Sequence, residues 1–147
     1  MSKPSEAGVA NLFAPHLQSD EALATTAYGV KQPHILLIVF FMLLGILPGL
    51  IVVLVMTKYY RVGLTDRRLM IIKTGTMKSL HEKGRIEFDL SDLKMAHVAT
   101  SVGPIFVNIR ITDHDRKFAA KFHRSYSKTN RLNAIAIAEA LSAGAPN

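Results

Sequence analysis

The chain has 147 residues, carries a formal net charge of +7 and contains no cysteine. The lack of cysteine excludes disulfide bonds, zinc–thiolate centres and cysteine nucleophiles, and the length allows one small domain beside an apolar segment. Residues 57–147 hold 16 Lys and Arg against 8 Asp and Glu, whereas residues 1–33 are slightly acidic. A basic domain indicates an anionic partner, either nucleic acid or a membrane surface.

The first two segments are short. Residues 1–18 contain two prolines, a glycine and several small residues, and we expect them to form a loose tail. Residues 19–33 lead into the apolar run that follows and include the stretch SDEALATTAYGV, a candidate strand.

Residues 34–57 form the predicted membrane segment. Their centre is the uncharged run ILLIVFFMLLGILPGLIVVLVM, in which 17 of 22 residues are Leu, Ile, Val or Phe. As one helix this run is roughly 33 Å long, close to the thickness of a hydrocarbon core of about 30 Å. Insertion is favoured by about 7 kcal/mol. The candidate interfacial anchors are Tyr28, Tyr59 and Tyr60.

Two arrangements of the run remain open. It forms either a single span kinked at Pro48 or a re-entrant hairpin that turns at Pro48-Gly49, and length favours the single span. Gly45 and Gly49 are small enough to allow close packing against other membrane helices. Most nearby Lys and Arg residues follow the run, so the positive-inside rule places the C-terminal domain in the cytoplasm, at the inner membrane.

Residues 58–142 change to a period of two, which is typical of strands. Apolar and polar residues alternate over 59–65, 85–90 and 105–112, with shorter strands over 69–72, 95–100 and 118–122. An amphipathic helix is predicted from Thr129, as its N-cap, to Leu141, and residues 143–147 form a tail. We therefore expect an α+β fold, a small curled antiparallel sheet or barrel capped by a C-terminal helix.

The stretch YYRVGLTDRRLMIIKTG and the later EFDLSDL resemble bacterial pleckstrin-homology-like domains. The resemblance covers roughly residues 59 to 142 and implies a curled sheet with a terminal helix, often joined to membrane segments and often oligomeric. Some members of that group have a strand just before the one that carries LTDRR. If residues 19–30 form this strand, both ends of the apolar run lie on one side of the membrane and the hairpin is correct.

The best candidates for binding anionic lipid are basic residues near the run. A Lys or Arg at an anionic leaflet contributes about 1 kcal/mol, although such residues also serve only to solvate strand edges. The candidates are Lys58, Arg61, Arg67, Arg68, Lys73 and Lys78.

Other chemistry has little support in the sequence. The histidines are scattered without metal-ligand spacing, and no nucleophile elbow or phosphate-binding glycine loop is present, so we predict no metal, no cofactor and no catalysis. Nucleic-acid binding is not expected, because it needs exposed aromatic residues among the cations. The nearest approach to such a surface is Arg110, Lys117, Lys121 and Arg124 with Phe122 and Tyr126.

The sequence therefore predicts a membrane-anchored, non-catalytic interaction module. Its domain would bind a protein partner, a second copy of the chain or the anionic lipid surface. The alternative is an accessory or structural subunit of a larger integral membrane complex.

Overall fold

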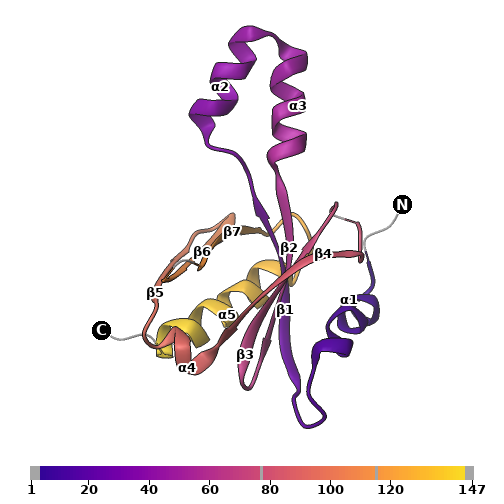
Figure 1. Ribbon diagram of the computed structural model, residues 1–147, viewed down its shortest axis with the longest axis vertical. Coiled ribbons are helices and arrows are strands. Elements are labelled where there is room, and N and C mark those ends of the chain that lie inside the picture. The colour runs from indigo at the N-terminus through magenta and orange to yellow at the C-terminus, as the bar shows by residue number, and fades with distance from the viewer. Residues whose placement is uncertain (1–3, 77, 115, 145–147) are drawn as a thin grey trace.

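The computed structural model describes residues 4–76, 78–114 and 116–144. Seven strands form one antiparallel sheet in the order β4-β3-β2-β1-β7-β6-β5 (Figure 1). The strands are β1 (Leu23–Lys31), β2 (Lys58–Thr65), β3 (Arg68–Thr74), β4 (Glu82–Asp89), β5 (His97–Val102), β6 (Phe106–Asp113) and β7 (Arg116–His123). The helices are α1 (Glu6–Phe13), the 3-10 turn η1 (Ala14–His16), α2 (Ile35–Leu44), α3 (Ile46–Met56), α4 (Leu90–Leu93) and α5 (Asn130–Gly144).

The sheet bends between β1 and β7. β1 pairs with β2 along its whole length, from Leu23 to Lys31, but it meets β7 only at Val30 and Lys121. This limited pairing lets the two halves of the sheet diverge, and α5 packs into the space between them (Figure 1). The predicted curled sheet capped by a terminal helix is confirmed.

The core follows from the period of the strands. Inward-facing residues of β6 and β7 are fully buried, whereas their neighbours along each strand face outward. The small residues Ala134 and Ala138 allow α5 to approach the sheet closely, and Ile137 fills the space between them. The helix extends to Gly144, beyond the predicted end at Leu141, and residues 145–147 of the predicted tail lie outside the described residues.

The loose tail expected for residues 1–18 is not what the structure shows over 6–16. Ser5 caps α1 by accepting a hydrogen bond of 3.0 Å from the Gly8 amide, and Phe13 is fully buried. Phe13 and Val9 pack against Met70 and Ile72 on β3, in a cluster separate from the main core. A helix of this length is not stable alone, so it forms because the sheet provides an apolar surface for it.

The apolar run forms a helical hairpin and not the single helix that its length favoured. α2 and α3 pack against each other and project from the sheet between β1 and β2 (Figure 1). The chain reverses at Gly45, whose φ of 147° suits glycine, so the turn lies before the predicted Pro48-Gly49. Pro48 is instead in the first turn of α3, where no intrahelical donor is lost.

The pairing of β1 with β2 explains why the run must return. Lys31 lies opposite Lys58 in the sheet, so the run leaves β1 and returns to the neighbouring β2 at the same end of the two strands. In the part of the chain that is described, no helix is both long enough and apolar enough to span a bilayer.

Candidate functional site

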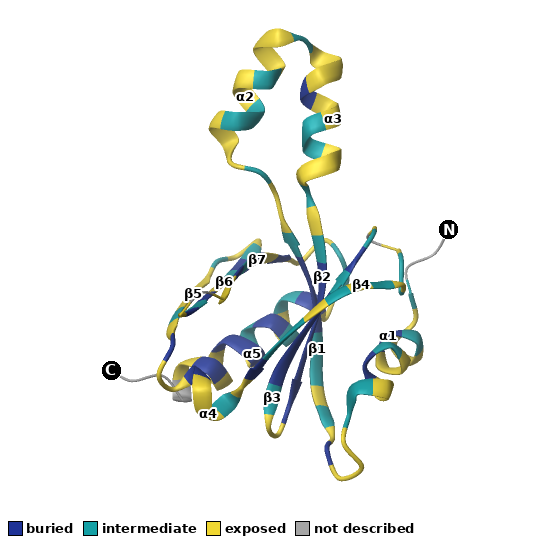
Figure 2. Cartoon of the chain, in the orientation of Figure 1, coloured by how far each residue is buried: buried dark blue, intermediate teal, exposed yellow. Residues whose placement is uncertain are grey.

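The most unusual surface of the molecule is the hairpin of α2 and α3. Fourteen of its large apolar side chains are between 37% and 81% exposed, and it carries no charged residue. Figure 2 shows the hairpin mainly in the colour of exposed residues, in contrast to the strands below it. An exposed apolar surface of this extent on a soluble protein is typical of a site that contacts a membrane or another protein.

The two glycines proposed for packing against other membrane helices act within the hairpin. A side chain on Gly49 would overlap the Met42 side chain, so the absence of a Cβ allows α3 to lie close to α2. Gly45 makes the reversal itself, and its amide donates to the Met42 carbonyl over 3.2 Å. Both positions are therefore explained by intramolecular contacts.

The six candidate lipid-binding cations do not form one cluster. Lys58 and Lys73 lie at the end of the sheet from which the hairpin projects, and the β3–β4 loop that holds Lys78 is at the same end. The β2–β3 turn with Arg67 is at the opposite end, about 26 Å away along an eight-residue strand. Arg61 is not available at the surface, because it is only 2% exposed.

Arg67 and Arg68 attach the N-terminal segment to the sheet. Arg68 donates to Glu21 over 2.9 Å and to Glu87 over 2.8 Å, and also bonds the His16 carbonyl. Arg67 pairs with Asp20, and the hydrogen bond from Arg67 holds the pKa of that carboxyl below its ordinary value. These contacts use the two arginines for tertiary structure.

Arg61 is held between two tyrosine rings. Its guanidinium carbon lies 4.7 Å from the Tyr28 ring centroid and 5.1 Å from that of Tyr126, whose hydroxyl accepts a hydrogen bond from Arg61. Tyr28 and Tyr60 are 4% and 8% exposed, so of the three predicted interfacial anchors only Tyr59 is partly exposed at the hairpin base. Burial raises the pKa of Tyr28.

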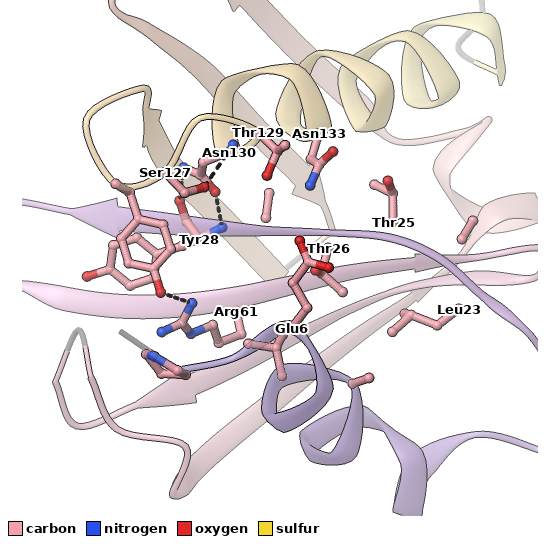
Figure 3. Close-up of a pocket in the computed structure, with 16 residues that line it drawn as sticks. Glu6, Leu23, Thr25, Thr26, Tyr28, Arg61, Ser127, Thr129, Asn130 and Asn133 are labelled. Carbon is pink, nitrogen blue, oxygen red and sulfur yellow. Dashed lines mark hydrogen bonds between the residues drawn. The ribbon is translucent and has the colours of Figure 1, made fainter. Parts of the chain in front are cut away.

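A cavity of about 400 Å³ lies between β1, α1 and the start of α5 (Figure 3). Asn130 lines this cavity, and its side chain accepts from the Tyr28 amide over 2.7 Å and donates to the Tyr28 and His123 carbonyls over 3.0 Å each. Asn130 thus satisfies strand atoms where β1 and β7 separate. Sequence reasoning missed it, because an asparagine near a helix start is normally interpreted as a cap.

Within residues 4–76, 78–114 and 116–144, no group of three or more His, Asp or Glu is placed to hold a metal ion. Most ion pairs among these residues belong to the arginine–carboxylate network that joins β3, β4 and the N-terminal segment.

No protein-family model and no curated protein matches the chain. Among solved structures, it is similar to the hSac2 domain from the human phosphoinositide phosphatase Sac2, with a TM-score of 0.48, 11% identity and coverage of 97% of this chain and 84% of that one. It is also similar to a pleckstrin homology domain from Shewanella amazonensis SB2B, with a TM-score of 0.38, 12% identity and coverage of 89% and 99%. Similarity at these TM-scores and identities implies nothing about the function of this chain. The fold follows from the strand order of the chain itself.

Proposed function

We propose that the protein is a membrane-anchored, non-catalytic binding module. The hairpin of α2 and α3 enters one leaflet of the membrane, and the curled sheet lies on the surface as the binding domain. The observation that carries this proposal is the exposure of an uncharged apolar hairpin on an otherwise well-packed domain.

The dimensions of the hairpin support insertion to the depth of one leaflet. α2 has 10 residues and α3 has 11, so each is about 15 Å long, half of a hydrocarbon core of about 30 Å. Backbone groups at that depth need partners. The Gly45 amide bonds Met42, the Gly49 amide bonds the Gly45 carbonyl over 3.3 Å, and Pro48 has no amide hydrogen to satisfy.

The charges at the hairpin base support an orientation. Lys31 and Lys58 flank the hairpin on neighbouring strands, and Lys73 is on the next strand. Cations beside a membrane segment favour the cytoplasmic side, so we place the sheet domain in the cytoplasm, at the inner membrane. Because the chain has no cysteine, single cysteines in place of the exposed Ser19 and Ser125 can report the side directly.

In intact cells, a membrane-impermeant maleimide should label neither cysteine, and after lysis it should label both. A Ser19 position that is labelled from outside while Ser125 is protected would show that the run crosses the membrane, and it would overturn the hairpin arrangement. Labelling of both positions in intact cells would overturn the cytoplasmic orientation.

Insertion itself is tested with Leu43, which is 81% exposed near the hairpin turn. An aspartate at membrane depth costs about 3 kcal/mol, so Leu43→Asp should weaken association with neutral phosphatidylcholine vesicles about a hundredfold in a flotation assay. The matched control is Leu132→Asp on α5, where leucine is 60% exposed, and it should bind like the wild type. Unchanged flotation of Leu43→Asp, or an equal loss in both variants, contradicts insertion by the hairpin.

A further inference from the structure

A second hollow, of about 600 Å³, lies on the outward face of β5, β6 and β7, beneath the segment that leads from β1 into the hairpin. We call it the basic hollow. It is lined by Lys31, His34, Arg110 and Lys121, with Ser101 and Asn108 from β5 and β6. We propose that the basic hollow binds the phosphate group of an anionic phospholipid. This inference rests on the proposed insertion of the hairpin.

The cations of the hollow occupy neighbouring strands. Lys31 lies opposite Lys58 on β2, and the residue before it, Val30, lies opposite Lys121 on β7. Lys121 in turn lies opposite Asn108, which lies opposite Ser101 on β5. A band of positive and hydrogen-bonding groups therefore crosses the sheet at the end from which the hairpin projects.

Arg110 has room to reach a ligand. In the sheet it lies between Ala99 on β5 and Ala119 on β7, so small side chains surround it on both sides. A guanidinium that is not enclosed by larger neighbours can offer its planar donors to phosphate oxygens in a bidentate manner. Arg110 is exposed, as are Lys31 and Lys121.

The cations of the hollow have no carboxylate partner in the part of the chain that the structure describes. The sequence has no Asp or Glu over residues 93–112 or 116–138. Among the described residues, arginines on β3, on β4 and at the start of β7 form ion pairs with carboxylates, whereas no ion pair is formed by Arg110, Lys121 or Lys31. The positive potential of the hollow is therefore available to an external anion.

The position of the hollow identifies the source of the phosphate. His34 caps α2 by accepting a hydrogen bond of 3.2 Å from the Leu36 amide, and His34 also lines the hollow. The residue that begins the membrane hairpin is thus part of the wall of the hollow. When the hairpin enters a leaflet, the hollow must lie at the level of the lipid headgroups, where anionic lipids supply phosphate at high local concentration.

Nucleic acid is a poorer candidate for this face. Binding of single strands depends on exposed aromatic rings that stack on bases. Phe122 is fully buried in the core, and the Tyr126 ring is stacked on Tyr28 at a centroid distance of 4.2 Å. Phe106 is partly exposed beside Lys121, but its ring is stacked on His123 and lies 4.9 Å from the Lys121 ammonium, so these three rings already have partners within the fold.

The test compares association of the full-length protein with vesicles of phosphatidylcholine alone and with phosphatidylglycerol added, at equal ionic strength. Each cation near an anionic surface changes affinity about fivefold, so Arg110→Gln/Lys121→Gln should lower the preference for phosphatidylglycerol about thirtyfold. Its binding to neutral vesicles should not change. The control, Lys94→Gln, removes an exposed cation beside α4, near the β2–β3 turn at the end of the sheet away from the hairpin, and should keep most of the preference.

Several results overturn the proposal. The preference survives in Arg110→Gln/Lys121→Gln, or it falls equally in the control, which would mean that only diffuse surface charge acts. Tight binding of inorganic phosphate by the protein in neutral micelles would identify a free anion as the ligand, and tight binding of a single-stranded oligonucleotide that the double variant abolishes would identify nucleic acid. Loss of binding to neutral vesicles in Leu43→Asp reports on insertion separately, so the two proposals can fail independently.

Discussion

Replacement of Arg61 tests whether the buried arginine stabilises the fold or binds a ligand. Its guanidinium contacts the Tyr28 and Tyr126 rings at 4.7 Å and 5.1 Å and donates to the Tyr126 hydroxyl. Desolvated cation–π contacts contribute about 1 to 2 kcal/mol each, and a hydrogen bond from a charged donor contributes about 1.5 kcal/mol. Because methionine retains part of the packing, we expect Arg61→Met to reduce the free energy of unfolding by about 3 kcal/mol.

The assay is urea and thermal unfolding of the full chain in neutral micelles, followed by circular dichroism. A loss of about 3 kcal/mol corresponds to a decrease in Tm of about 9 °C for a chain of this size. Lys58→Met is the matched control, since Lys58 is an exposed cation on the same strand, and it should change stability by less than about 0.5 kcal/mol. The reasoning is refuted if Arg61→Met unfolds like the control, or if it abolishes the preference for phosphatidylglycerol while stability is unchanged.

Three further predictions concern how the N-terminal segment and α5 are attached to the sheet. Phe13→Ala should cost about 3 kcal/mol of docking energy, so hydrogen exchange should increase in α1 while β6 and β7 stay protected; uniform exchange throughout would contradict local docking. Asn130→Ala should lower the free energy of unfolding by about 2 to 3 kcal/mol, because it leaves the Tyr28 amide and carbonyl without their side-chain partner; an unchanged urea midpoint would show that this link is dispensable. The pKa of Asp20 is lowered by Arg67, so this pair stabilises the fold above pH 3.8 and loses its effect as the pH falls further. Asp20→Asn should therefore remove that acid-dependent component, and an identical pH–stability profile in the variant would disprove it.

The period of the sequence was sufficient to predict most of the sheet. Alternation along β2 and β6 places Val62 and Ile109 inward and their neighbours outward, and this pattern depends only on the two-residue repeat of an extended chain. The terminal helix could be recognised in the same way from its 3.6-residue repeat. Local chemistry is sufficient for such elements because their apolar faces are visible in consecutive residues.

The prediction failed where distant contacts decide local structure. α1 carries an apolar stripe of Val9, Leu12 and Phe13, but with only eight residues its stability comes from the packing of this stripe against β3, which the short stripe alone does not reveal. The length of the apolar run favoured one helix, but the pairing of Lys31 with Lys58 requires the chain to return. Arg67 and Arg68 looked like surface cations because their partners Asp20 and Glu21 lie more than 40 residues earlier in the chain.

The sequence alone determined that this protein combines an uncharged apolar segment with a basic antiparallel sheet and a terminal helix, since composition and periodicity are properties of neighbouring residues. Only the tertiary structure decided which cations are available to an anion. The pairing of β1 with both β2 and β7 brings Lys31 beside Lys121, while the folding of the N-terminal segment against β3 supplies carboxylates to Arg67 and Arg68. Both outcomes depend on contacts between segments that are far apart in the chain, and the free energy of such contacts cannot be inferred from local sequence.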